Sequence, residues 1–390
     1  MSATMPVVTD EQRRALLMSR HRHVPYRRAA CAADVADAVL GLHATDPATV
    51  YLSAAARLAE PRHDDIERVL YDRSRLLRLT GMRGTLFVVP TELAPTVLAA
   101  TGRTHAAVRT AGLLRVLEQD GLGDHATLTA LFDDVLALLR CRGEMTTREI
   151  AAEIPVLQKQ LVVSAGKSYE SRRSLAVEVS FVMAADGRIV RAGRRGGWTS
   201  TQHAWAVAPA LPEIPVREAR AELAHRWLAA FGPGTVADLK WWTGWTVTDT
   251  RKALRDSAAV EVSLQGEPGY ALESQLGPLE SPEPAAVLLP ALDPTPMGWR
   301  NRDFYLDPAY VPSLFDRMGN IGPTIWWNGR IVGGWAQCRN GTLAARLLID
   351  PGRAARKAID TEIDRVAGYL ADRRFTPAYR TPLERDLAGH

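Results

Sequence analysis

Three polar side chains, His43, Thr45 and Asp46, stand within four residues of one another between two apolar, alanine-rich segments. A neutral imidazole accepts a hydrogen bond from water and can take its proton, because its unperturbed pKa of ~6.5 lies near neutrality. A threonine hydroxyl can hold the same water, and a carboxylate can stabilise a developing cation. The alternative is structural, since Asp46 before Pro47 is typical of a helix cap and a lone His often interacts with a helix C-terminus.

The elements around this triplet are predicted from periodicity. Apolar side chains at 32, 35, 36, 39, 40 and 42 form a helical stripe ahead of it. Thr9 is a good N-cap for an earlier helix with an acidic first turn. Residues 85–90 predict a short apolar strand ended by Pro90, and residues 91–113 predict another helix.

Two later segments share one order of elements. Residues 125–207 predict a helix, a second short helix, a third helix, and a hairpin with a Gly/Arg-rich turn. The short helix is capped by Thr146 or Thr147, and Glu149 is the acidic residue of a capping box. Residues 217–274 repeat this order, with Thr235 as a cap and a hairpin turn at Gly-Glu-Pro-Gly, residues 266–269. Three helices followed by a hairpin are typical of a winged helix-turn-helix.

The last segment has a different composition. Residues 281–296 are Pro-rich, and residues 322–349 predict three strands joined at Asn328-Gly329 and Asn340-Gly341. A closing helix follows. We therefore predict an α+β protein of tandem winged helix-turn-helix domains with a C-terminal antiparallel β-domain. The predicted domains are 1–122, which carries the polar triplet, 123–212, 213–280 and 281–390.

Composition limits the class of protein. The chain has 390 residues and is 46% hydrophobic, which is enough for several domains and a sizeable core. No apolar run approaches the ~18 residues that cross a bilayer, and no secretory signal is apparent, so we expect a soluble cytoplasmic protein. The widely spaced Cys31, Cys141 and Cys338 argue against disulfides, a zinc site or an iron–sulfur cluster.

Charge points to an anionic partner. The net charge is +4, and only five of the 48 basic residues are Lys. An Arg-rich basic chain suits nucleic acid, although a GC-rich genome produces the same bias.

Several motifs in a fixed order carry a family resemblance. They are "GLHATDP", "MRGTLFVV", "FGPGTVADLKWWTGW", "LLPALDP" and "GNIGPTIWWNGRIVGGW". Over nearly the whole chain they resemble the winged-helix DNA glycosylases of the AlkZ/YcaQ type. The resemblance implies three tandem winged helices and a C-terminal β-domain in a concave arrangement that accepts duplex DNA, and therefore association with the nucleoid. It also implies excision of N-alkylated purines, including bulky natural-product adducts and crosslinks, often as self-resistance.

The triplet occupies the position of that family's catalytic motif, which is Gln-aliphatic-Gln (or Gln-aliphatic-Asp) followed by Asp-Pro. This chain has His43 and Thr45 in place of the two catalytic side chains. An N7- or N3-alkylated purine is already cationic and leaves without a general acid, so the enzyme must position a water at C1′ and stabilise an oxocarbenium-like sugar. We expect His43 to accept from that water and take its proton, Thr45 to hold it, and Asp46 to orient the site or supply negative charge.

The expected function is therefore a monofunctional DNA glycosylase, a monomer that acts on double-stranded DNA carrying alkylated purines and uses no metal or other cofactor. The tryptophans Trp241, Trp242 and Trp245, at helical spacing, are expected in the core. The expected DNA-binding residues are Arg57, Arg83, Arg194, Arg195, Trp198, Asn328 and Arg330.

Loss of both catalytic Gln residues leaves a second hypothesis, a non-catalytic winged-helix regulator or adduct sensor. Retention of Gly41, Ala44, Asp46 and Pro47 around the changed positions favours the enzyme. A nuclease is disfavoured because the sequence lacks the carboxylate clusters that two-metal chemistry needs.

Overall fold

A computed structural model of the chain describes residues 5–163, 171–277 and 281–389. Helices combine with small antiparallel sheets, which confirms the predicted α+β class. No helix in these ranges has both the length and the apolar character that crossing a membrane requires.

The first unit places the polar triplet at the edge of a small sheet. Its elements are α1 (Asp10–Arg20), α2 (Ala32–Ala38), β1 (Leu42–His43), α3 (Pro47–Arg57), α4 (His63–Tyr71), β2 (Leu76–Thr80), β3 (Leu86–Pro90), α5 (Ala94–Val97), a π-helical turn (Leu98–Gly102) and α6 (Arg103–Gln119). The sheet order is β1-β3-β2, antiparallel throughout. The predicted cap at Thr9 and the strand ended by Pro90 are both confirmed.

The second unit follows the predicted order of helices and hairpin. Its elements are α7 (His125–Arg142), β4 (Met145–Thr146), α8 (Thr147–Glu153), β5 (Gln160–Val163), β6 (Ser171–Ser174), α9 (Leu175–Ala185), β7 (Ile189–Arg194) and β8 (His203–Val207). Thr146 is the N-cap of α8, and Glu149 completes the predicted capping box. The pair β5–β6 was not predicted, because its strands alternate weakly between apolar and polar side chains.

The third unit contains α10 (Val216–Phe231), α11 (Val236–Thr243), α12 (Val247–Asp256), β9 (Val260–Leu264) and β10 (Glu267–Ala271). Thr235 caps α11 as predicted. The predicted Gly-Glu-Pro-Gly turn is wrong, because the chain reverses at Gln265 and Gly266, both with positive φ, and Pro268 lies inside β10. A two-stranded sheet tolerates this proline, since β10 is an edge strand.

The C-terminal unit contains β11 (Ala286–Leu289), α13 (Val311–Leu314), β12 (Thr324–Trp327), β13 (Arg330–Gln337), β14 (Leu343–Leu347), α14 (Arg353–Leu370) and α15 (Pro382–Ala388). The two Asn-Gly pairs lie in the turns of the β12–β13 and β13–β14 hairpins, as predicted. The sheet has four strands rather than three, because the fully buried β11 joins its edge from within the Pro-rich segment.

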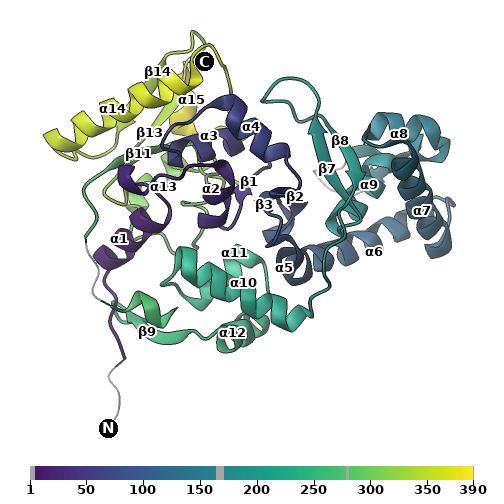
Figure 1. Cartoon of the computed structure of the whole chain (residues 1–390), viewed down its shortest axis with the longest axis horizontal. Helices are drawn as coiled ribbons and strands as arrows, with labels where there is room; N and C mark the ends of the chain where they lie inside the picture. Colours follow the sequence, from purple (N-terminus) through teal and green to yellow (C-terminus); the bar gives the residue numbers. More distant parts are fainter. Residues whose placement is uncertain (1–4, 164–170, 278–280, 390) are drawn as a thin grey trace.

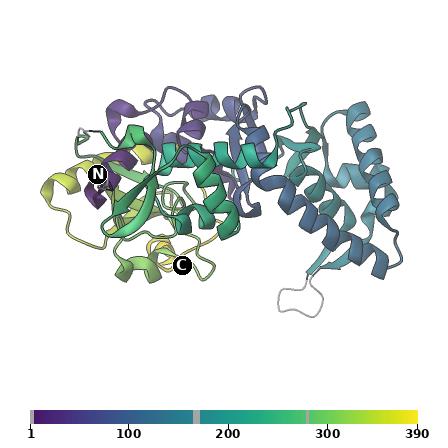
Figure 2. The same cartoon turned by 90° about the horizontal axis from the view of Figure 1, so that it is seen from below.

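The units differ in how they form their cores. The second unit has a core of its own, built from residues 113–205. The first and C-terminal units share another, in which β11 and α14 pack with α2 and α3. Figure 1 shows the helices α7, α8 and α9 at one end of the long axis and α14 at the opposite end, and Figure 2 shows the same separation from below. The predicted boundaries at 122, 212 and 280 remain a prediction.

Candidate active site

His43 lies in the short strand β1, not at a helix C-terminus as the structural alternative supposed. The helix α2 ends at Ala38, and the chain turns into β1 through Gly41, whose φ is +107°. A Cβ on Gly41 would lie 2.8 Å from a Val89 methyl group, so only glycine allows this close approach of β1 to β3. His43 pairs with Phe87 in the sheet, which fixes the direction of its side chain.

The imidazole of His43 is a buried, neutral hydrogen-bond acceptor. The side chain is 4% exposed, and its ring meets Phe87 edge to face with 5.1 Å between centroids. Its Nδ1 is buried and has no hydrogen-bond partner among the described residues. Burial and then the charge of Arg83 lower the pKa of His43 to about 3. The expectation of a base near its unperturbed pKa is therefore wrong, and the ring can accept a hydrogen bond but holds a proton weakly at neutral pH.

His43 faces a cavity of about 590 Å³ at the junction of several units. Two of the predicted side chains, Thr45 and Arg83, line the same cavity, and Thr45 makes no side-chain hydrogen bond within the described part of the chain. The other lining residues come from far apart in the sequence. They are Thr85, Trp241, Leu292, Met297, Arg302, Val311, Phe315, Asp316, Arg317, Met318, Gly319, Asn320 and Tyr379.

Arg83 supplies a positive charge to the cavity wall. It adopts a φ of +55° between Gly81 and Gly84, and its guanidinium lies 4.1 Å from the ring centroid of Trp241. Burial and then Arg302 lower the pKa of Arg83 to about 10, so it stays protonated at neutral pH.

Trp241 is a site residue that the sequence did not reveal. Trp242 and Trp245 are buried in the core as predicted, but Trp241 is only partly buried and lines the cavity. The guanidinium of Arg302 lies 4.9 Å from its ring centroid. The adjacent pair of tryptophans was the available signal, since neighbouring residues on a helix cannot face the same side.

Asp46 acts on backbone groups and does not line the cavity. It is the N-cap of α3, where one carboxylate oxygen accepts from the Ala48 N–H at 3.0 Å. The other oxygen accepts from the Ala378 N–H at 2.8 Å. Burial raises the pKa of Asp46, and these backbone hydrogen bonds oppose the shift. Through these hydrogen bonds Asp46 holds the triplet against residues 374–380.

The DNA contact predicted for Arg57 is wrong. Arg57 is fully buried at the end of α3 and forms an ion pair with Asp293, with 2.6 Å between Nη2 and the carboxylate. Its guanidinium also donates to Ser53 and His21 carbonyl oxygens, at 2.9 and 3.1 Å, so it ties the first unit to the "LLPALDP" segment. An arginine four residues after a serine on an otherwise apolar helix could have suggested this internal role.

The other predicted DNA contacts lie outside the cavity. Arg194 forms an ion pair with Glu67 of α4, and Trp198 packs edge to face on Tyr51 with 5.7 Å between centroids. Both side chains therefore hold the β7–β8 hairpin against the first unit. Arg195 is exposed.

The turn between β12 and β13 is also exposed. Asn328 and Arg330 both face solvent there, and Arg14 lies close enough for the charge of Arg330 to lower its pKa, after the larger effect of burial. These two side chains and Arg195 are accessible to a DNA backbone.

Comparison with known proteins finds one matching family and a similar solved structure. The model of a family described as AlkZ-like DNA glycosylases matches residues 36–369. Among solved structures, the chain is similar to the DNA glycosylase AlkZ of Streptomyces sahachiroi, with a TM-score of 0.71 and 21% identity over 93% of this chain and 97% of that one. Comparison with curated protein sequences gives no significant match.

Proposed function

Because the chain belongs to the AlkZ-like DNA glycosylase family, we propose that it hydrolyses the N-glycosidic bond of alkylated purines in double-stranded DNA. The substrate class we propose is bulky N7-alkylguanine, which forms when a DNA-damaging natural product alkylates guanine. The biological role we propose is self-resistance. The observation that carries this proposal is the cavity that a neutral His43 and Thr45 both line, where the Thr45 hydroxyl has no hydrogen-bond partner among the described residues.

The two side chains suit hydrolysis of a cationic nucleotide. The alkylated base leaves as a neutral purine when the bond from its ring nitrogen to C1′ breaks, and the electron pair of that bond stays on the nitrogen. A water held by His43 and Thr45 then bonds to C1′ and releases its proton to solvent as the new C–O bond forms. Because the pKa of His43 is about 3, its part is to orient the water by accepting a hydrogen bond.

The lining of the cavity favours a substrate whose base carries a bulky substituent. Val311, Phe315 and Met318 form an apolar side, and Met318 is 85% exposed. A volume of about 590 Å³ lies in the range of pockets that bind drug-sized molecules. An adduct with a large apolar group would bury that group against this side while its guanine stays near His43.

The second hypothesis, a catalytically silent adduct sensor, rests on the missing Gln residues of the family motif. A sensor would bind adducted DNA through the same cavity but leave the glycosidic bond intact. The two hypotheses therefore differ in product and not in binding.

The test is an excision assay on duplexes that each carry one guanine adduct, either N7-methyl or a bulky aromatic N7-alkyl group. Reactions contain EDTA, because a cationic leaving group needs no Lewis acid, and abasic sites are revealed by alkaline cleavage. We expect faster excision of the bulky adduct and no strand break before alkali. Tight binding of the bulky duplex without abasic sites would reject the enzyme in favour of the sensor.

A further inference from the structure

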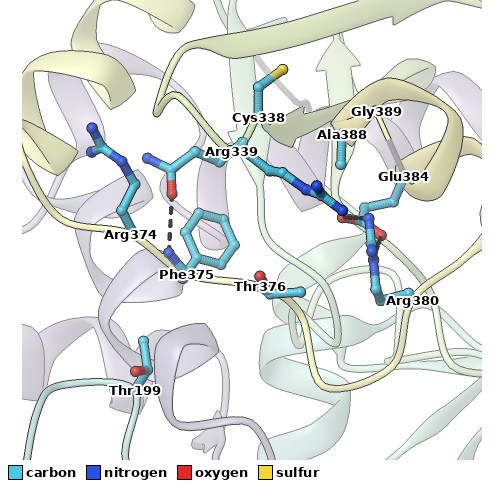
Figure 3. Close-up of a pocket in the computed structure, with 11 residues that line it drawn as sticks. Thr199, Cys338, Arg339, Arg374, Phe375, Thr376, Arg380, Glu384, Ala388 and Gly389 are labelled. Carbon is cyan, nitrogen blue, oxygen red and sulfur yellow. Dashed lines mark hydrogen bonds and ion pairs between the residues drawn. The ribbon is translucent and has the colours of Figure 1, made fainter.

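A second cavity lies close to the active site and carries a different chemistry. It has a volume of about 560 Å³ and is bounded by the β13–β14 turn, residues 374–380 and α15. Thr199 of the β7–β8 loop closes another side (Figure 3). Three guanidinium groups, those of Arg339, Arg374 and Arg380, line it.

Two of these positive charges are uncompensated. Arg380 forms an ion pair with Glu384, with 2.7 Å between Nε and the carboxylate. Within the described residues, no carboxylate oxygen lies within 4.0 Å of a guanidinium nitrogen of Arg339 or Arg374. Both side chains are exposed, so their charge faces solvent.

The position of Arg374 is fixed by its surroundings. Its Nη2 donates to the Asn340 carbonyl oxygen at 3.2 Å, and its Nη1 donates to the Ala371 and Arg373 carbonyl oxygens at 3.3 and 3.1 Å. A Cβ on Gly341 would collide with its guanidinium. The side chain of Gln337, only 8% exposed, accepts from the Phe375 N–H and donates to the Arg373 carbonyl, each at 3.0 Å. Gln337 thus holds the segment of Arg374 against β13, and Figure 3 shows its bond to Phe375.

One short segment connects this cavity to the active site. Ala378 donates to Asp46, next to Thr45, while Tyr379 lines the active-site cavity and Arg380 lines the second one. At no more than ~3.6 Å per residue, Arg374 lies within roughly 14 Å of Ala378 along the chain. The backbone of Arg374 therefore lies near the segment that contacts Asp46, and Arg339 lines the same cavity as Arg374.

We propose that Arg339 and Arg374 form a binding site for the DNA backbone, which holds phosphates beside the damaged base. The proposal rests on the proposed function for its ligand. An arginine guanidinium donates charge-assisted hydrogen bonds to phosphate oxygens and is always charged at neutral pH. The site fixes the register of the duplex relative to His43 and carries no sequence preference.

The experiment measures binding of an adducted duplex to the full chain over a range of salt concentrations. The double variant Arg339→Gln/Arg374→Gln should weaken binding, and the slope of log K against log salt should fall by ~1.8, since each phosphate contact contributes ~0.9. Both side chains are exposed, so the variant should fold normally.

The matched control is Arg353→Gln/Lys357→Gln, which removes the same charge from exposed positions in the first turns of α14. Arg353 lies roughly 25 Å along that helix from Leu370, at 1.5 Å per residue. Leu370 ends α14 four residues before Arg374, so the control positions are at the far end of the helix from the second cavity. This control should leave the slope unchanged. An equal change in the two double variants, or none in either, would overturn the proposal.

Two further readouts separate the other outcomes. Excision by the control variant Arg353→Gln/Lys357→Gln should match that of the wild type, and binding is measurable even if the chain excises nothing, so failure of the proposed function would be seen separately. If the variant abolished stabilisation of the protein by inorganic phosphate but left the DNA slope intact, the cavity would be a small-anion site and the proposal would be wrong.

Discussion

Replacement of His43 by alanine tests the chemistry of the site most directly. Because the pKa of His43 is about 3, the residue is uncharged at neutral pH, and the variant removes a hydrogen-bond acceptor without changing the charge of the cavity. DNA affinity, which depends on phosphate contacts, should therefore change little. Excision should fall.

The size of the fall follows from the role of the ring. A positioned acid–base group typically contributes 10²–10⁴-fold to a rate. His43 holds protons weakly and orients water instead, so the lower end, about 100-fold, is expected. This corresponds to ~2.7 kcal/mol at ~1.4 kcal/mol per factor of ten.

The assay is single-turnover excision of a bulky N7-alkylguanine with saturating enzyme, in parallel with thermal unfolding, since removal of the ring leaves a cavity beside Phe87. The control is His43→Gln, which restores the amide acceptor of the family motif and should retain activity within about tenfold. The ratio of wild-type to His43→Ala rates should stay constant from pH 5 to 8, above the pKa of about 3. Equal rates in the two proteins, or a ratio that falls as His43 titrates between pH 6 and 7, would refute the reasoning.

Other expected outcomes concern Thr45 at the cavity and three buried side chains of the first unit, His21, His43 and Arg57. Thr45→Ala should slow excision roughly tenfold at unchanged DNA affinity, because it removes one of two groups that hold the water; an unchanged rate would exclude Thr45 from water binding. Burial lowers the pKa of both His21 and His43 to about 3, so the unfolded chain binds more protons below pH ~6.5. The free energy of unfolding should then fall between pH 6.5 and 3, by up to ~1.4 kcal/mol per pH unit for each ring, as urea titrations at several pH values would show. Arg57→Met should lower that free energy by ~3–5 kcal/mol because Asp293 is left buried and unpaired, and should not alter the salt dependence of DNA binding; a lower salt slope would return Arg57 to the DNA interface.

Local patterns in the sequence predicted much of the fold. Caps at Thr9, Thr146 and Thr235, and the Asn-Gly turns, depend on side chains within three or four residues, so their signals are visible in the sequence. The strand β11 was missed because it owes its existence to burial between β12 and α14, which a Pro-rich context conceals. Tertiary contacts of this kind have no local signature.

The residues of the site also divide into those that the sequence predicted and those that only tertiary contacts bring to the cavity. Resemblance to the family motif predicted His43 and Thr45 as catalytic residues, and Arg83 was predicted as a DNA contact. The fold brings all three to one cavity, although α2 ends earlier than the helical stripe suggested. The apolar wall at Val311 and Met318 was not predicted, since these residues meet the triplet only across the interface of the first and C-terminal units.

Helix α3, which follows the triplet, explains both why His43 and Thr45 reach the cavity and why the DNA contact predicted for Arg57 is wrong. One side of α3 is fastened to the C-terminal unit by Asp46, whose second oxygen binds the Ala378 N–H, and by Thr49, which donates to the Ala291 carbonyl at 2.7 Å. Ser53 and Arg57 complete the row by binding Asp293. These residues recur at intervals of three or four, so they face one side of the helix. Polar residues between positions 43 and 57 look like one catalytic and DNA-binding series in the sequence, but the fold separates them. Only His43 in β1 and Thr45 directly after it reach the cavity. The cavity wall from the C-terminal unit is consequently set by α3, and a bulky substrate meets it at a position that this buried row of polar contacts determines.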